Sequence, residues 1–432
     1  MELAIRFRTA CILVIAAALL VAASCGPAAA AATKTLVVEA GKQARAHVPM
    51  SIEAPAGATN SRMTSGGKAV PCQVTEGRLW WILDALPATK TLTYAVELGA
   101  PAAAAKGVEL RASPQTIAIT IEGKPFTVYL FTNPKFIGQQ LRRPYFWPVF
   151  GPGQVTMTRP YPLTTEKIPG NVTKDHPHHT SIWVAHGAVN GVDDWSISGK
   201  AGWIVHKTFE MVVSGPVMGM FRETLDWTTV DKKPVMAEVR TARVYRLPDT
   251  HRLLDLELVF QAKYGPVKFG DTKEGGLCAT RMRPEFRADG KGGSKGRLVN
   301  SSGETAAGAW GKKAAWVDCS GAVDGKTLGF AIFDAPGNLR HPTTWHARIY
   351  GLLTANPFGL RHFTKGKQKG DHTVEAGKEM TQRYRIYFHA ATRKPPTWPS
   401  DTPTTPSRPR RRGNSRNRLA TRCSRLWARS LL

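Results

Sequence analysis

Alternation of apolar and polar residues over several long runs most constrains the fold of this chain. The clearest runs cover residues 116–122, 235–247, 254–264 and 383–389. A period of two, bounded by Gly, Pro and Asp, is typical of antiparallel strands with one buried face. No segment has a long amphipathic helical period. We therefore predict an all-β protein built on a large antiparallel β-sandwich, galactose-mutarotase-like by analogy at the level of the fold.

Composition shifts divide the chain into four parts. In residues 1–32, Arg6 and Arg8 precede an apolar run at 11–23 that is too short to cross a membrane and suits a secretion signal. Residues 33–110 are expected to form a small N-terminal β-sandwich-like extension, and residues 111–392 the main domain. Residues 393–432 are rich in Pro, Ser and Arg and are predicted to be a disordered basic tail.

The signal predicts a secreted or periplasmic protein. The alternative is a lipoprotein attached through Cys25. No other stretch is long and apolar enough for a transmembrane span. Four cysteines follow the signal, too few for a disulfide framework, and we expect buried thiols at Cys72, Cys278, Cys319 and Cys423.

The charge is strongly positive. Of the net +27, the tail from Arg393 carries +10 and residues 1–32 carry +1, which leaves +16 for the body. Such a surface favours anionic partners, namely acidic polysaccharide, nucleic acid or anionic lipid. Because export separates the protein from the cell's nucleic acids, we expect no nucleic-acid partner.

The densest cluster of chemically active residues lies at 175–186. Four of the twelve histidines occur within eleven residues there. Histidine titrates near neutral pH and is a common metal ligand. We therefore regard His178, His179 and His186 as candidates for proton transfer, and Asp175, His176, His178 and His179 as candidate ligands of a divalent metal.

Two further regions add acids, bases and aromatic rings. Residues 268–276 follow a predicted strand and carry Asp271 and Glu274, which can act as acid or base; a solvated charged turn is the alternative. In residues 344–350, His346 and Arg348 lie on one strand face and Trp345 on the other. The candidate substrate-binding residues are Arg281, Arg348, Trp183, Trp195, Trp345 and Asn356, although tryptophans also build ordinary cores.

Several motifs in fixed order resemble a bacterial family. They are HPHHTSIWVAHG from His176, FGDTKEG from Phe269, WVD from Trp316 and PTTWHARIYG from Pro342, preceded by RPYFWP from Arg143. Across roughly 115–389 they resemble the family named "methane oxygenase PmoA", a domain of unknown function. The resemblance implies an exported β-rich protein with a histidine-rich pocket. We do not expect methane oxidation, because a methane monooxygenase subunit of that name spans the membrane several times and this chain has no span.

The leading functional hypothesis is a carbohydrate-active enzyme that uses His and carboxylate proton transfer, as an isomerase, lyase or hydrolase. The alternatives are a metal-dependent oxygenase or hydrolase at the HPHH cluster, and a non-catalytic polysaccharide-binding protein. No nucleophile-elbow motif and no glycine-rich nucleotide loop is present. We expect the HPHH loop, the DTKEG loop and the WHxRxYG strand to meet at one face of the sandwich.

Overall fold

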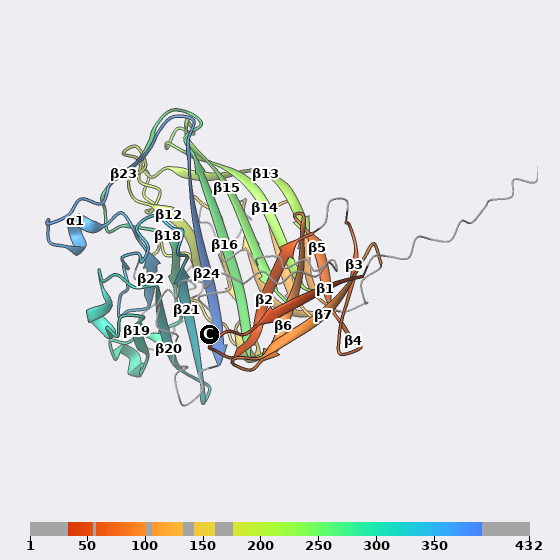
Figure 1. The fold of residues 1–432 in the computed structure, drawn as a ribbon. Helices are drawn as coiled ribbons and strands as arrows, with labels where there is room; N and C mark the ends of the chain where they lie inside the picture. The colour runs from red at the N-terminus through yellow and green to blue at the C-terminus, as the bar shows by residue number, and fades with distance from the viewer. Residues whose placement is uncertain (1–32, 55–57, 101–105, 133–141, 160–175, 391–432) are drawn as a thin grey trace, which may run out of the picture.

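A computed structural model describes residues 33–54, 58–100, 106–132, 142–159 and 176–390 (Figure 1). The predicted secretion signal, the basic tail, Cys25, Cys423 and Asp175 lie outside these residues. The described chain is built almost entirely from antiparallel strands, which confirms the all-β prediction. Cys72, Cys278 and Cys319 are buried free thiols, also as predicted. None of the helices in the described ranges has the length and apolar character needed to cross a membrane.

The first seven strands form two small sheets around their own apolar core. One sheet contains β1 (Thr33–Glu39), β7 (Thr91–Leu98), β3 (Ser61–Ser65) and β4 (Lys68–Val70). The other contains β2 (Arg45–Glu53), β6 (Arg78–Leu86) and β5 (Cys72–Thr75). Trp81, Leu79 and Met63 lie at the centre of this core, almost completely buried. We call residues 33–98 the N-terminal unit.

Two large sheets form the main sandwich. The seven-stranded sheet runs in the order β22 (Leu352–Ala355), β18 (Gly275–Arg281), β12 (Ile182–His186), β11 (Tyr145–Val149), β10 (Lys124–Leu130), β9 (Thr116–Ile121) and β8 (Val108–Ala112). The eight-stranded sheet runs in the order β13 (Trp203–Val213), β14 (Met218–Thr228), β15 (Pro234–Tyr245), β16 (His251–Gln261), β24 (Glu379–Ala390), β21 (Lys326–Asp334), β20 (Trp316–Val323) and β19 (Arg297–Asn300).

Short elements complete the described chain. A two-stranded sheet pairs β17 (Val267–Phe269) with β23 (His372–Val374). The single α-helical turn, α1, covers Leu360–Phe363. The 3-10 turns are η1 (Pro152–Gln154), η2 (Pro284–Phe286), η3 (Lys291–Gly293) and η4 (Ala306–Ala309). Figure 1 shows α1 and the N-terminal unit on opposite sides of the main sandwich.

The main core lies between the two large sheets, where the predicted alternation places it. Leu254, Leu256 and Leu258 of β16 point into this core, and so do Ile117 and Ile119 of β9. A chain with a period of two can bury one face of each strand in this way while it leaves the other face for different contacts.

Strand β15 is the exception, because it turns its charged face inward. Glu238 and Arg240 lie on the same side as Met236 and Ala242, which belong to the main core. The Arg240 guanidinium donates to both Glu238 carboxylate oxygens, from Nε at 2.7 Å and from Nη2 at 3.0 Å. Two opposite charges that satisfy each other's hydrogen bonds can be buried, whereas either one alone would be costly.

This pair belongs to a buried polar network that joins the two sheets. Tyr129 of β10, in the seven-stranded sheet, donates to Glu223 of β14 and accepts from Arg240 Nη1 at 3.0 Å. His206 Nδ1 lies 2.6 Å from the second oxygen of Glu223. Trp227 Nε1 donates to Glu238 at 2.7 Å. Burial raises the pKa of Tyr129 well above its ordinary value, so the phenol keeps the proton that it donates.

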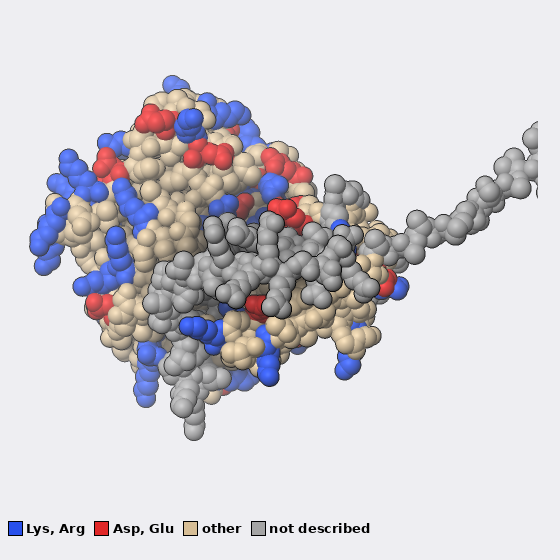
Figure 2. Space-filling view, viewed as in Figure 1, with Lys and Arg blue, Asp and Glu red and all other residues tan. Residues whose placement is uncertain are grey.

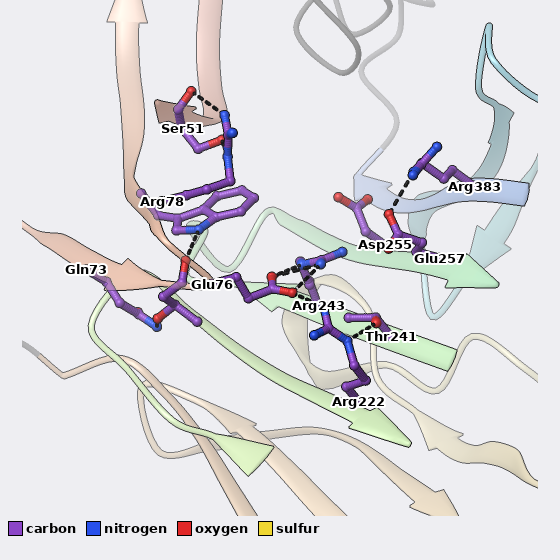
Figure 3. Close-up of polar contacts among 12 residues, drawn as sticks. Ser51, Gln73, Glu76, Arg78, Arg222, Thr241, Arg243, Asp255, Glu257 and Arg383 are labelled. Atoms are coloured by element: carbon purple, nitrogen blue, oxygen red, sulfur yellow. Dashed lines mark hydrogen bonds and ion pairs between the residues drawn. The ribbon is translucent and has the colours of Figure 1, made fainter. Parts of the chain in front are cut away.

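The N-terminal unit is fixed to the outer face of the eight-stranded sheet by one carboxylate and one amide (Figure 3). Glu76 accepts from Arg243 Nε at 3.0 Å and from Arg243 Nη2 at 2.8 Å, and it also accepts from Arg222. Gln73 Oε1 accepts the backbone N–H groups of Val217 and Met218. Trp80 and Ile82 of the N-terminal unit also pack against an apolar cluster of the large sheet. The large sheet is thus covered on both faces near this end.

We predict that Arg240→Met lowers the free energy of unfolding by about 3–5 kcal/mol, because Glu238 remains buried without its counter-charge. Adding Glu238→Gln should recover part of this loss, since the amide removes the buried charge and keeps an acceptor for Trp227. Urea unfolding measures both changes. Arg111→Met is the control, because Arg111 pairs with Glu109 at the surface and is expected to change stability by less than about 1 kcal/mol. An Arg240→Met variant as stable as the control would contradict the role of the network.

Candidate functional site

The outer face of the seven-stranded sheet carries a second apolar cluster at β12, β18 and β22. Trp183 of β12 pairs with Ala279 of β18, and both point away from the main core. Arg281 follows on the same face, opposite Leu352 of β22. Trp195 packs on the cluster from a loop. The candidate site is built on this face.

Four aromatic rings form a continuous stack across this face. The ring centroids of Trp183 and His179 are 5.4 Å apart, those of His179 and His176 are 4.8 Å apart, and those of His176 and Tyr350 are 5.0 Å apart. Successive ring planes differ by 23°, 10° and 14°. We call this the ring stack. Because His176 and His179 are members of it, two of the clustered histidines have packing roles.

Two buried arginines hold the backbone of the HPHH loop in place. Arg143 donates to the Asp194 carbonyl at 2.9 Å and also to the His178 carbonyl, which ties the loop to the turn that carries Trp195. Arg159 Nη2 donates to the His176 carbonyl at 2.9 Å. Loop carbonyls that are buried need such donors, because water does not reach them.

Arg281 joins the ring stack to the rest of the site. Its Nη1 donates to His179 Nδ1 at 3.3 Å, so the proton of the His179 ring lies on Nε2. Burial lowers the pKa of His179 well below its ordinary value, and the charges of His178 and Arg281 lower it further. The guanidinium carbons of Arg281 and Arg348 lie 4.6 Å and 5.5 Å from the ring centre of Tyr350. Tyr350 thus has two cations at its ring.

One ring nitrogen of His346 donates a hydrogen bond, and the other is left as an acceptor. Its Nδ1–H donates to the Lys273 carbonyl at 2.7 Å, and Asn356 Nδ2 donates to the same oxygen at 3.2 Å. In a neutral imidazole the proton on Nδ1 leaves Nε2 unprotonated. Burial lowers the pKa of His346 to about 4. At neutral pH, His346 is therefore a neutral base.

Glu274 supplies a negative charge that acts on both His346 and His178. Burial alone would raise the pKa of Glu274, but the hydrogen bond and charge of Lys273 outweigh it, and the charges of His346 and His178 add to the lowering. Glu274 is therefore ionised at neutral pH. Its carbonyl accepts from Gly187 N at 2.7 Å. A Cβ at Gly187 would lie 2.4 Å from this oxygen, so only glycine permits the approach.

His178 completes the site as a half-buried neutral imidazole. Burial lowers its pKa to about 4, with contributions from Arg143 and His176, and Glu274 opposes this shift. Its ring meets His179 edge-on, with centroids 4.4 Å apart, and Trp195 at 6.1 Å. The HPHH loop, the DTKEG loop and the WHxRxYG strand thus come together, as the sequence predicted. The rings of His176 and Tyr350 join the HPHH loop to the WHxRxYG strand, and the bond from His346 to the Lys273 carbonyl joins that strand to the DTKEG loop.

Four residues selected from the sequence are held by hydrogen bonds to backbone groups. His186 is fully buried, and its Nε2–H donates to the Gly270 carbonyl at 2.9 Å. Asp271 accepts the backbone N–H groups of Arg361 and Gly370. Trp345 points into the main core and donates to the Ala314 carbonyl. Asn356 is buried and positions the carbonyls of Thr272 and Lys273. Each has a packing or loop-holding role in the described structure.

Among the described residues, the predicted metal ligands do not surround a common point as the ligands of a metal ion would. Within those residues, no three His, Cys, Asp or Glu side chains converge as metal ligands. His176 and His179 lie flat against each other in the ring stack. Asp175, the fourth candidate, is outside the described residues. No step is therefore assigned to a metal.

Sequence reasoning did not select Tyr350, Trp310, Arg143 or Arg159. Tyr350 and Arg143 are part of the quoted motifs, but nothing in a strand pattern shows that two arginines converge on one tyrosine. Arg143 and Arg159 act on carbonyls of a loop that follows them in the chain, and such contacts leave no periodic signal.

We predict that His186→Gln reduces the pH dependence of stability in mildly acidic solution. Burial lowers the pKa of His186 from its ordinary value of 6.5 to about 4. Between these values the unfolded chain binds more protons than the folded one, so stability falls as the pH falls. Gln can still donate to Gly270 but does not titrate. The slope of unfolding free energy against pH should therefore decrease by up to about 1.4 kcal/mol per pH unit.

The control for this experiment is His362→Gln, at an exposed position on α1. It should leave the slope unchanged. An identical slope for His186→Gln and the wild-type protein, measured by urea unfolding at several pH values, would show that His186 is not held neutral in the fold.

Comparison with known proteins gives a family but no activity. No curated protein matches the chain. Residues 116–396 match a family described as "Family of unknown function (DUF6807)". The match covers more than half of the chain, including every element of the candidate site, and begins after the N-terminal unit. The chain belongs to the family of unknown function DUF6807.

Proposed function

We propose that the protein is a carbohydrate-active enzyme in which His346 takes a proton from the substrate. The observation that supports this most directly is the hydrogen bond from His346 Nδ1–H to the Lys273 carbonyl, 2.7 Å long. It leaves Nε2 as the basic atom, and the lowered pKa keeps that atom unprotonated at neutral pH.

The groups around His346 suit a sugar. Trp310 meets the His346 ring edge-on, with centroids 6.4 Å apart, and the Arg348 guanidinium lies 6.0 Å from the Trp310 ring centre. Aromatic faces pack against the C–H faces of a pyranose, and a guanidinium can donate to several hydroxyl or carboxylate oxygens at once. Arg348 is exposed, so its side chain can contact a ligand at the protein surface.

The protonation states favour an isomerase or a lyase over a hydrolase. A glycosidase that protonates its leaving group from a carboxylic acid needs a carboxyl group with a raised pKa. Glu274 has a lowered pKa and is ionised. The pair formed by Glu274 and His346 is instead suited to take a proton from a carbon or a hydroxyl group and to stabilise the imidazolium that results.

Each residue then has a defined part in proton transfer. The substrate proton moves to His346 Nε2, and the imidazolium is stabilised by the hydrogen bond to the Lys273 carbonyl and by the charge of Glu274. Tyr350 keeps its proton at neutral pH, because burial raises its pKa despite the charges of Arg281 and Arg348. In an isomerase the imidazolium returns the proton to the substrate. In a lyase the Tyr350 hydroxyl donates a proton to the departing oxygen.

The location of the enzyme is part of this proposal. The charged and apolar pattern of residues 1–32 supports export, so the substrate would be met outside the cytoplasm. The resemblance to the PmoA-named family adds no activity, and we propose none from it.

His346→Asn provides the main test, because the Asn amide can keep the bond to Lys273 but has no atom at the position of Nε2. We expect turnover to fall by about 10²–10⁴-fold with unchanged melting. The assay is a panel of mono- and oligosaccharides in D2O, with ¹H NMR to detect deuterium entering carbon positions or new double bonds. His362→Asn is the matched control and should behave as wild type. Full turnover by His346→Asn on substrates that the wild-type protein converts would refute the proposal.

The pH profile gives a second prediction. Since the base form of His346 is required, kcat/KM should be constant near neutral pH and fall about tenfold per pH unit below a pKa of about 4. Glu274 raises the pKa of His346, so Glu274→Gln should move this acid limb to lower pH and also reduce the rate. An acid limb that does not move in Glu274→Gln would show that the carboxylate does not act through His346.

A further inference from the structure

A strongly basic surface borders the candidate site. Residues 361–369 carry Arg361, Lys365, Lys367 and Lys369, all exposed, and contain no acidic residue. Figure 2 shows Lys and Arg side chains gathered on this side of the molecule, where Figure 1 places α1. We call these four cations, together with Lys312 and Lys313, the basic rim.

Aromatic contacts tie the basic rim to the catalytic histidine. Phe363 of α1 packs edge-on against Trp310, with ring centroids 5.2 Å apart, and its ring lies 6.4 Å from that of His346. Lys312 and Lys313 follow Trp310 in the chain after Gly311. The guanidinium carbon of Arg348 lies 6.0 Å from the ring centre of Trp310. A ligand seated at His346 therefore has cations beyond it along the surface.

Two of the acids near the rim, Asp271 and Asp371, bond groups other than the rim side chains, and the third, Glu304, pairs with Lys312 of the rim. Asp271 accepts the backbone N–H of Arg361 at 3.0 Å and that of Gly370, at the two ends of the segment. Asp371 pairs with Lys268 at 3.3 Å, and Glu304 pairs with Lys312 at 3.6 Å. Asp271 thus holds the segment in place by its backbone, while the lysine side chains at 365–369 extend into solvent.

We propose that the substrate of this site is an acidic polysaccharide whose chain lies along the basic rim, with the carboxylate of one uronic acid unit bound by Arg348 beside His346. The spaced exposed cations match a polymer that carries one negative charge on each of several units, and they raise its local concentration at the site. The neighbouring rings of Trp310 and Phe363 favour a sugar polymer over other polyanions. The catalytic part rests on the function proposed above, whereas the binding part does not.

Binding is tested with polygalacturonate, with dextran of similar length as the neutral probe and single-stranded RNA as the non-sugar polyanion. The variant Lys365→Gln, Lys367→Gln, Lys369→Gln should weaken polygalacturonate binding by about tenfold or more at low ionic strength, and added salt should weaken wild-type binding. The matched control is Lys68→Gln, Lys90→Gln, Lys106→Gln, which removes three exposed lysines on or next to the N-terminal unit and should change little. Three results would overturn the inference. One is an equal loss of polygalacturonate affinity in the two triple variants. The others are binding of dextran as tight as that of polygalacturonate, and binding of RNA tighter than that of polygalacturonate.

Arg348→Gln separates this inference from the proposed reaction. It should raise KM for acidic oligosaccharides by a larger factor than KM for neutral ones, because only the acidic ones lose a charge-assisted contact. If neutral saccharides are converted in a His346-dependent way while polygalacturonate neither binds nor reacts, the acidic substrate is wrong and the proposed reaction stands. If polygalacturonate binds through the rim but no saccharide is converted, the reaction is wrong and the surface is a polysaccharide-binding site.

Discussion

The structure depends on a charged network that joins the two large sheets inside the main core. Tyr129 belongs to the seven-stranded sheet, while Glu223, Glu238 and Arg240 belong to the eight-stranded sheet. Apolar contacts have no direction, so they allow one sheet to slide over the other with little change in energy. Hydrogen bonds between buried charges have fixed geometry, and breaking one leaves a charge in the core. The network therefore fixes the register between the sheets, and with it the position of the outer face that carries the site.

The seven-stranded sheet contributes to both the main core and the candidate site, because successive side chains along its strands point to opposite faces. In β18, Cys278 faces the main core, whereas Ala279 and Arg281 face the site. In the segment that continues the sheet beyond β22, Trp345 faces the core and His346 and Arg348 face the site. The packing of the core thus determines where the site residues lie, and a change in register by one residue would exchange the two sets.

The electrostatics of the site follow from how its charges are held. Arg143 and Arg159 are buried, and they donate to backbone carbonyls of the HPHH loop. Their positive charge and the burial of the rings keep His178 and His179 neutral. His346 is also neutral, yet it lies beside ionised Glu274. A neutral base next to a carboxylate, with exposed Arg348 and the basic rim beyond, is the arrangement on which both proposals rest.

The sequence alone determined the all-β fold and the four strands with the clearest alternation, β9, β15, β16 and β24, because a period of two follows from strand geometry and needs no long-range information. It also predicted that His178, Glu274 and His346 would meet, from motifs at strand ends. It did not predict which face of β15 is buried, since Glu238 and Arg240 are stable in the core only when Trp227 of neighbouring β14 and Tyr129 of the opposite sheet bond to them. For the same reason it could not separate His186 and Asp271 from His346: all three bond backbone groups, but His346 also lies near Trp310 and exposed Arg348, whereas His186 is completely buried. Residue type and spacing are local properties, whereas the partner of each polar group is decided by the tertiary structure.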